Sequence, residues 1–184
     1  TEDELRKVLH GGLDHGLIIP VVCASATKLI GVRQLLHNIA FSGPSPFDRD
    51  PIEAGSQSLV ADPAAPAAVH VFKTAADPFV GRLTYMRVVT GTVKSDSHLW
   101  NSNKAADERL GTIYIQRGKD QLPVSELQAG DIGVVAKLTQ TATGETLRAK
   151  ELEAEFPPIQ FPNPVFSMAV RPTTKGAVDK LGTS

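Results

Sequence analysis

The sequence predicts a mainly β protein: an antiparallel β-barrel or sandwich, preceded by a partial α/β segment. Two observations predict the barrel. Short runs rich in β-branched and aromatic residues follow one another within residues 68–155, and turns that contain glycine separate them without helices between them. The α/β segment is predicted by residues 1–46, which combine two helical stripes with one continuous apolar run.

The first predicted element is a helix near the start of the chain. Thr1 followed by Glu4 is a capping-box pattern at a helix start. Gly16 can end the helix in a left-handed cap. Between them, apolar residues recur at helical spacing and define one stripe: Leu5, Val8, Leu9 and Leu13.

A strand and a second helix are predicted next. Residues 17–23 are apolar without alternation, which is typical of a strand covered on both faces in a parallel sheet. Residues 29–39 carry apolar side chains on one side of a helix, and Pro44 and Pro46 stop the pattern. One strand with two helices cannot complete a sheet. We expect either that this segment was cut from a larger domain or that a small helical lid covers the strand.

The remaining chain divides into a linker, the barrel and a last strand. Residues 47–67 are rich in Pro, Ala, Ser and Asp with little periodicity, which indicates a linker. Gly81, Gly91 and Gly144 stand where tight turns need positive φ. One strand is expected at residues 165–170. The barrel strands are expected at residues 69–73, 82–89, 98–100, 111–115 and 132–138.

Composition limits the classes of partner. The formal net charge is −1, so the chain as a whole does not attract nucleic acid, and an RNA contact would need a local patch. No apolar run approaches the roughly 20 residues of a membrane helix, and the acidic start carries no signal-peptide pattern. The single cysteine, Cys23, cannot form an internal disulfide, which suits a reducing compartment. We expect a cytoplasmic protein with no membrane partner.

Several short motifs follow one another in a fixed order along the chain. The sequence A-S-A-T-K at residues 24–28 resembles the last nucleotide-contacting element of translational GTPases. V-F-K-T at 71–74 and D-P-F-V-G-R-L-T-Y-M-R-V at 77–88 resemble the opening of domain II of elongation factor G, and F-P-N-P-V-F-S at 161–167 resembles the first strand of domain III. The motifs T-G-T-V, A-G-D-I and T-G-E-T-L continue domain II in family order at residues 90–93, 129–132 and 143–147.

The resemblance implies four parts and a function. Residues 1–46 would be the C-terminal remnant of a GTPase domain, 47–67 a linker, 68–155 the domain II β-barrel and 156–184 the start of domain III. The chain would then be the non-catalytic ribosome-docking and domain-coupling barrel of a GTP-dependent translocation factor. The alternative is the barrel of a ribosomal-protection or regulatory paralogue without translocase activity. The implied partners are the ribosome, through small-subunit rRNA, and the other domains of the parent chain.

The resemblance also implies site residues and cofactors. Ser25, Ala26 and Thr27 would contact guanine in the intact parent, through backbone N–H groups that meet its O6 atom. GTP and Mg²⁺ would belong to the parent, because the phosphate-binding pattern G-x-x-x-x-G-K-[ST] occurs nowhere in this sequence. We expect no cofactor, no metal ion and no GTP hydrolysis for this chain alone, although the parent is expected to be a GTPase.

Other candidate residues were weighed against ordinary structural roles. Basic and acidic residues balance within 68–155, so rRNA contact is assigned by inspection to Arg117 and Lys119, which flank a glycine turn. Cys23 is expected to be a small buried hydrophobe rather than a nucleophile. Asp107 and Glu108 form a carboxylate pair that is expected to lie in a solvated turn. The five histidines show no metal-ligand spacing, and Trp100 is expected to pack in the barrel.

A further expectation concerns assembly. The apolar run at residues 17–23 would be costly to leave open, since burying one Leu, Ile or Val side chain is worth roughly 1.5–3 kcal/mol. A second copy of the chain is one source of cover, by strand addition across a symmetric interface. We therefore expect a homo-oligomer to be possible through this strand.

Overall fold

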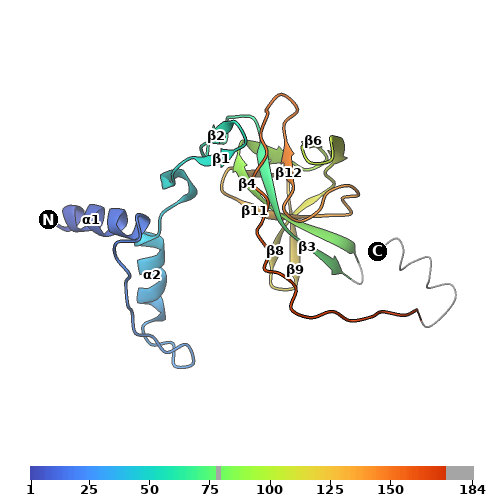
Figure 1. Cartoon of the computed structure of the whole chain (residues 1–184). Coiled ribbons are helices and arrows are strands. Elements are labelled where there is room, and N and C mark those ends of the chain that lie inside the picture. Colours follow the sequence, from blue (N-terminus) through green and yellow to red (C-terminus); the bar gives the residue numbers. More distant parts are fainter. Residues whose placement is uncertain (78–79, 173–184) are drawn as a thin grey trace.

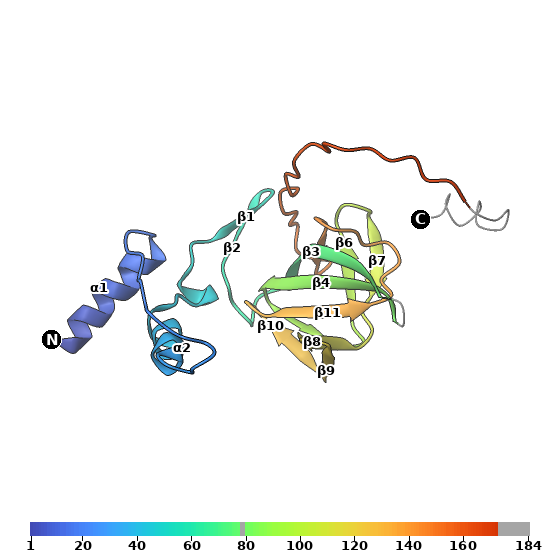
Figure 2. The ribbon, with the colours of Figure 1, turned by 90° about the horizontal axis from the view of Figure 1, so that it is seen from below.

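The protein is described here from a computed structural model, which places residues 1–77 and 80–172; for Glu2 and Arg6 only the backbone is described. Figure 1 shows a pair of helices, a thin connecting segment and a β-barrel in succession along the chain. After the barrel, residues 149–172 form no helix or strand, and the end of this segment extends away from the barrel. Figure 2 shows the same separation between the helices and the barrel from a second direction.

Both predicted helices are present. Helix α1 spans Glu2–Asp14, and its capping box is formed, because the Thr1 hydroxyl accepts from the backbone N–H of Glu4 at 3.4 Å. Helix α2 spans Val32–Ser42 and begins after Gly31, which has a φ of 71°. A Cβ atom on residue 31 would lie 2.6 Å from the carbonyl oxygen of Cys23, so only glycine fits at this turn.

The strand predicted at residues 17–23 is wrong. This segment lies outside every helix and strand, and the only pairing nearby in the described chain is an isolated antiparallel bridge between Ser25 and Ile30. The side chains of Leu17, Ile19 and Val21 are more than four-fifths exposed. A strand requires a neighbouring strand for its backbone hydrogen bonds, and no described segment of the chain supplies one here.

The linker contains short structure that its composition did not predict. A 3₁₀ helix, η1, spans Pro46–Asp48, and strands β1 (Ile52–Ala54) and β2 (Gln57–Leu59) form a two-stranded antiparallel sheet. Strands of three residues are too short to show alternation in a sequence. Ala54 and Leu59 are buried, so this hairpin is packed against the protein rather than free in solvent.

The barrel consists of antiparallel strands, which confirms the predicted fold class. Eight strands form one sheet in the order β7-β6-β12-β3-β4-β11-β8-β9, and β10 pairs separately with β5. The predicted strands correspond to β3, β4, β6, β8 and β11. The strand bounds are β3 (Ala68–Asp77), β4 (Gly81–Thr90), β5 (Thr92–Lys94), β6 (His98–Asn101), β7 (Ala106–Arg109), β8 (Ile113–Arg117), β9 (Asp120–Val124), β10 (Glu126–Gln128), β11 (Ile132–Ala136) and β12 (Thr146–Arg148).

A glycine closes the tight connection between β4 and β5. Gly91 has a φ of 80°, and a Cβ atom there would lie 2.4 Å from the Cα atom of Ala67. Positive φ and a close backbone neighbour both exclude other residues at this position. Gly81 and Gly144 also have positive φ, as the sequence predicted.

The barrel interior is a single apolar cluster. It is built by side chains that alternate inward along the strands, so that the sheet curves around them. Met86 and Val88 of β4 belong to it, and both are fully buried. The other members are Ala67, Val69, Val71, Val93, Leu99, Leu110, Ile113, Leu127, Val135, Leu138 and Leu147, with Val124 at its edge.

A second apolar cluster joins the two segments that flank the barrel. Ala54 and Leu59 come from the linker hairpin, and Ala154 and Phe156 come from the chain after β12. They meet Ala68 and Val89 of the sheet, with Leu152 packed alongside. The segments before and after the barrel are therefore held against the same part of it.

The last predicted strand is also wrong. Residues 165–170 lie outside every strand, and Val165 and Phe166 are exposed. As with residues 17–23, no described strand lies beside them to form a ladder.

Candidate functional site

The loop before α2 holds the residues predicted to contact guanine. Ser25 closes the loop with two backbone hydrogen bonds to Ile30, of 2.9 Å and 3.2 Å. The Ser25 hydroxyl also accepts from the backbone N–H of Lys28 at 3.4 Å. Within the described chain, no group accepts a hydrogen bond from the backbone N–H of Ala26 or Thr27. Both residues are exposed, so two adjacent donors at the tip of this loop face solvent.

Cys23, which precedes this loop, was predicted to be buried. Cys23 is exposed rather than buried, because the segment that contains it is not part of a sheet. Its sulfur is the only thiol of the sequence. Among the described residues, no group of three or more His, Cys, Asp or Glu side chains is placed to hold a metal ion.

The residues predicted to contact rRNA lie at a hairpin tip. Arg117 ends β8 and Lys119 precedes β9, with Gly118 between them at a φ of 60°. Both basic side chains are exposed, and neither forms an ion pair with any side chain that the structure describes. Figures 1 and 2 show the β8–β9 hairpin on the barrel and the guanine-contact loop beyond α2, so the structure does not bring these predicted sites together.

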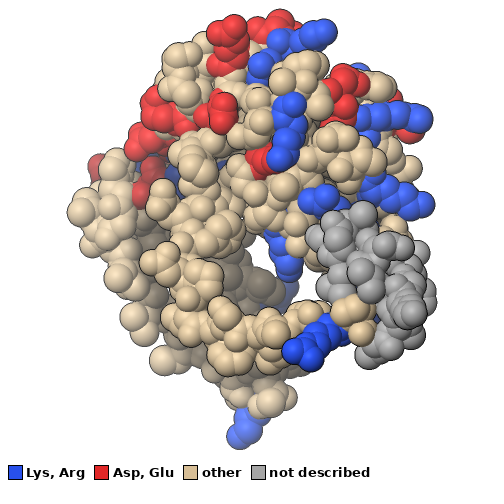
Figure 3. All heavy atoms as spheres, turned by 45° about the vertical axis from the view of Figure 1, so that its right-hand side comes forward, with Lys and Arg blue, Asp and Glu red and all other residues tan. Residues whose placement is uncertain are grey.

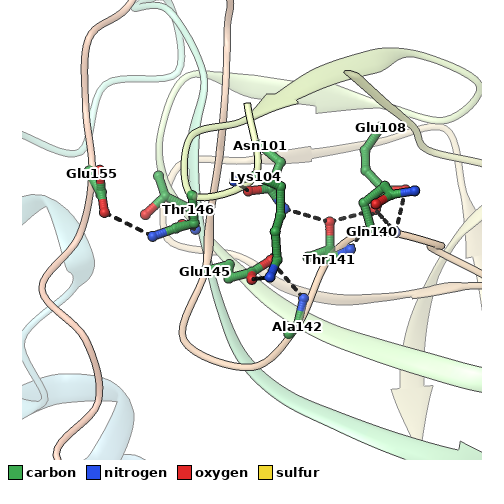
Figure 4. A network of polar contacts seen from close by, with 10 residues as sticks. Asn101, Lys104, Glu108, Gln140, Thr141, Ala142, Glu145, Thr146 and Glu155 are labelled. Atoms are coloured by element: carbon green, nitrogen blue, oxygen red, sulfur yellow. Dashed lines mark hydrogen bonds and ion pairs between the residues drawn. The ribbon is translucent and has the colours of Figure 1, made fainter. Parts of the chain in front are cut away.

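Glu108 was predicted to lie in a solvated turn, and this prediction is wrong. The side chain is only 3% exposed, and both of its oxygens accept hydrogen bonds from the loop that follows β11. Oε1 accepts from the backbone and hydroxyl of Thr139, at 3.0 Å and 3.2 Å, and Oε2 accepts from the backbone and hydroxyl of Thr141, at 3.0 Å and 2.5 Å. The backbone N–H of Gln140 lies between the two oxygens (Figure 4). Its neighbour Asp107 is exposed, as predicted, and contacts His98 at 2.5 Å.

A second buried carboxylate continues this network. Glu145 Oε2 accepts from the Asn101 side-chain amide at 2.9 Å and from the backbone N–H of Ala142 at 2.8 Å. Its other oxygen lies 3.4 Å from Lys104 Nζ. Asn101 is fully buried and also donates to the Thr141 hydroxyl at 3.2 Å, which connects the two carboxylates (Figure 4).

Hydrogen bonding keeps both carboxylates ionised. Burial acts to raise the pKa of Glu108, but the bonds from Thr141, Gln140 and Thr139 outweigh it and hold the pKa below its ordinary value. For Glu145, burial likewise acts to raise the pKa, while bonds from Asn101 and Ala142 and the ammonium of Lys104 lower it overall.

The network is suited to fixing a loop rather than to acid–base chemistry. A general acid or base needs a pKa near the working pH and room for a reacting group beside it. These two carboxylates have lowered pKa values, and their oxygens are already occupied by donors of the protein. We assign the network to holding residues 139–145 against β6 and β7. Sequence inspection missed it because Glu108 and its partners lie more than 30 positions apart.

Trp100 lies beside a surface pocket. The pocket has a volume of about 560 Å³ and is lined by His98, Trp100, Asp107 and Lys150, among others. Lys150 Nζ stands 5.4 Å from the centre of the indole ring. The indole is half-buried, so it packs partly against the barrel and partly under a lysine.

Charges on this side of the molecule are mixed. Figure 3 brings the right-hand side of Figure 1 forward and shows acidic and basic side chains interspersed over its upper part. Exposed ion pairs, such as Arg109 with Asp96 at 3.5 Å, also occur in the described chain. No single sign of charge dominates the described face in this view, so it offers no evident surface for a polyanion.

Comparison with known proteins identifies the barrel. The family model described as elongation factor G domain 2 matches residues 66–150. Residues 66–150 form an elongation factor G domain 2. The matched range covers β3 to β12, and thus the whole barrel together with the Glu108 and Glu145 network.

A solved structure extends the likeness beyond domain 2. A protein of Thermus thermophilus is 31% identical, and its crystal structure matches the whole of this chain with a TM-score of 0.77. The matched part is 26% of that protein's chain. The chain thus carries an elongation factor G domain 2 at its centre and is similar over its whole length to part of the Thermus protein. No helix among the described residues is long and apolar enough to cross a membrane.

Proposed function

We propose that this chain supplies the ribosome-docking and domain-coupling barrel of a GTP-dependent translation factor that promotes translocation. The domain 2 match supports the translation role. The coupling role is supported by the second apolar cluster, in which Leu59 before the barrel and Phe156 after it pack together on the sheet. Through this cluster, a displacement of the preceding segment is transmitted to the following one by direct contact.

The loop of Ser25, Ala26 and Thr27 would serve the nucleotide of the intact parent. Its exposed N–H groups at Ala26 and Thr27 are suited to a carbonyl oxygen such as the guanine O6. The sequence contains no G-x-x-x-x-G-K-[ST] pattern, so the phosphates and Mg²⁺ would be held by other parts of the parent. Under this proposal the 184-residue chain contributes one edge of a GTP site and no hydrolysis of its own.

Ribosome docking would use local positive charge. Arg117 and Lys119 stand at an exposed hairpin tip, where phosphates can approach without steric hindrance. Charges act locally within a Debye length of about 10 Å at 0.1 M salt, so a chain with net charge −1 can still bind RNA at such a tip.

Co-sedimentation with small ribosomal subunits tests the proposal. We expect the chain to pellet with the subunits at low salt and to be released as salt rises. Replacing Arg117 and Lys119 by glutamate should weaken pelleting about tenfold or more, because two attractive phosphate contacts become repulsive. Lys94→Glu, on β5, is a matched single-charge control. Absence of pelleting by the unaltered chain would refute the docking proposal.

The step that the parent catalyses needs a separate measurement. A single-turnover translocation assay with the parent protein should show GTP-dependent movement of the messenger RNA. Docking without translocation would instead support a ribosomal-protection or regulatory paralogue.

A further inference from the structure

An uninterrupted row of side chains crosses the outer surface of the barrel sheet. In register, Lys73 of β3 stands opposite Tyr85 of β4, and Tyr85 stands opposite Val134 of β11. Val134 in turn faces Tyr114 of β8. Residues directly opposite on neighbouring strands project to the same face of a sheet, so these four side chains share one surface. The inward positions beside them, such as Met86 and Val135, belong to the barrel core instead.

An apolar residue, Val134, lies between the two tyrosines in the register of the sheet. Val134 is only 1% exposed, although it is not a member of the barrel core cluster. Its cross-strand neighbours on both sides are tyrosines, and both are half-buried. Phe72 extends the row, with its ring 6.4 Å from that of Tyr85 and a side chain 37% exposed. We call Phe72, Lys73, Tyr85, Tyr114 and Val134 the tyrosine face.

The tyrosine face is partly exposed: Phe72 and Lys73 are exposed, and Tyr85 and Tyr114 are half-buried. Figure 2 shows the backbone of β4 and β11 toward the viewer. Toward the end of β4, the same side of the strand is covered at Val89 by the second apolar cluster. The helices α1 and α2 lie to one side, beyond the linker.

Two cations and one acidic residue lie on the side of the tyrosine face. Of the charged residues in β3, β4, β11 and β8, Lys73, Arg87 and Asp77 alternate to the same side as Tyr85, whereas Arg82 and Arg117 alternate to the opposite side with Met86 and Ile113. Asp77 accepts a hydrogen bond from the backbone N–H of Val80, at the turn that ends β3. Lys73 Nζ lies 5.2 Å from the centre of the Tyr85 ring, which places a cation beside a stacking surface. This contrasts with the net charge of −1 for the whole chain.

We propose that the tyrosine face binds unpaired RNA bases, which stack on Tyr85 and Tyr114, while Lys73, on the outer side of Tyr85, contacts the phosphate next to the base on that ring. The proposal rests on the ribosome-docking function above and adds where, and to which form of RNA, the barrel binds. It places a second RNA contact on the sheet face, distinct from the phosphate contact of Arg117 and Lys119 at the hairpin tip.

Geometry favours single-stranded RNA over a duplex or a peptide. One strand, β11, separates the two tyrosines, and strands lie about 4.8 Å apart, so the backbone positions of the two tyrosines are about 10 Å apart across the sheet. Two splayed bases can occupy them separately, as bases do on aromatic side chains of sheet surfaces. In a duplex the bases are paired and stacked inside the helix, so no base is free to stack on the tyrosine rings. An acidic peptide would use the cations but would leave the tyrosine rings without partners.

Fluorescence anisotropy with a labelled single-stranded oligouridine tests the proposal on the whole chain. We expect Tyr85→Leu and Tyr114→Leu each to weaken binding by about 5- to 100-fold, because leucine keeps Val134 covered but cannot stack on a base. Tyr85→Phe and Tyr114→Phe retain the ring and should bind as the unaltered chain does. Fluorescence of Trp100, the only tryptophan, reports whether each variant keeps its barrel.

Two matched lysine variants locate the phosphate contact. Lys73→Gln should weaken oligouridine binding and reduce its dependence on salt, whereas Lys119→Gln at the hairpin tip should change neither. The reverse pattern would overturn the proposal in favour of the hairpin. Equal affinity for a duplex of the same length would also overturn it, because the face would then be sensing phosphate charge alone.

Small-subunit pelleting separates this proposal from the docking function. If the unaltered chain pellets and the leucine variants pellet equally well, docking stands and the tyrosine face is excluded as its contact. If the unaltered chain fails to pellet but binds oligouridine through the tyrosines, the docking function fails and RNA binding by this face stands. Loss of pelleting in the leucine variants supports both.

Discussion

At the scale of single residues, Glu108 shows how a charged side chain can act inside a barrel. Its carboxylate receives five donor groups from Thr139, Gln140 and Thr141, of which three are backbone N–H groups and two are hydroxyls. Removing a buried acceptor leaves those donors without partners, and each unsatisfied group costs about 1–3 kcal/mol. The loop of residues 139–145 thus depends on one carboxylate from β7.

Glu108→Ala should lower the free energy of unfolding by about 2–4 kcal/mol, because the loop donors lose their shared acceptor. Denaturant titration followed by Trp100 fluorescence measures the change. Asp107→Ala is the matched control on the same strand, and we expect it to stay within about 0.5 kcal/mol because its side chain is solvated. Similar losses for both variants would contradict the role assigned to Glu108.

The lowered pKa values of Glu108 and Glu145 predict that the protein loses stability in acid. The pKa values of Glu108 and Glu145 are lowered from 4.5 in the folded protein, so the unfolded chain takes up protons first as the pH falls. Their contribution is therefore fully present above the unfolded value and is lost as the pH falls through the folded pKa values.

Denaturation midpoints measured on either side of pH 4.5 should show this decline. A double variant, Glu108→Gln with Glu145→Gln, should be less stable at neutral pH and should show a flatter acid profile. An unchanged profile in the double variant would assign the acid sensitivity to other groups.

At the scale of elements, Phe156 holds the segment after the barrel in place. Its side chain is 4% exposed and lies against His70, with ring centres 5.4 Å apart. Its backbone N–H donates to the Thr146 hydroxyl of β12 at 2.8 Å. His70 is half-buried, and burial lowers its pKa, so a neutral imidazole packs under the phenyl ring.

Phe156→Ala should cost about 3 kcal/mol of stability, since it opens a cavity in the second apolar cluster. It should also raise amide hydrogen exchange in residues 152–156 and in the β1–β2 hairpin, which share that cluster. Phe161→Ala is the matched control because Phe161 is 68% exposed, and it should change neither quantity. Exchange that rises in the tail alone would mean that the two flanking segments are not coupled.

At the scale of the whole molecule, the chain consists of a barrel with its own core and a helical segment without one. Every buried apolar residue lies at position 54 or later among those the structure describes. The face between α1 and α2 remains open as an apolar pocket of about 360 Å³. Cover of residues 17–23 by a second copy of the chain stays a prediction.

Two truncations test this division. Removing residues 1–44 should leave the melting temperature of the barrel within about 2 °C, because no buried apolar contact is lost. Removing residues 1–61 should lower it by about 5 °C or more, because Ala54 and Leu59 leave the second cluster. Trp100 on β6 reports barrel melting in both. A large loss from the shorter truncation would show that the helices stabilise the barrel.

Elements with local signals were predicted well. The capping box of Thr1 and Glu4, the positive φ of Gly91 and the main strands of the barrel all depend on a few neighbouring residues. The family resemblance was readable for the same reason, since its motifs are short and ordered. The fold class and the elongation factor G domain 2 assignment therefore required only the sequence.

Tertiary structure alone decided the rest, because each case depends on contacts between distant positions. Residues 17–23 have the composition of a strand, yet a ladder needs a neighbouring strand, and the described chain places none there. Glu108 is buried because residues 139–141 meet it, and Tyr85 and Tyr114 share a surface because β11 pairs with both β4 and β8. Local sequence indicated the main barrel strands, and only their pairing determined which side chains stand together.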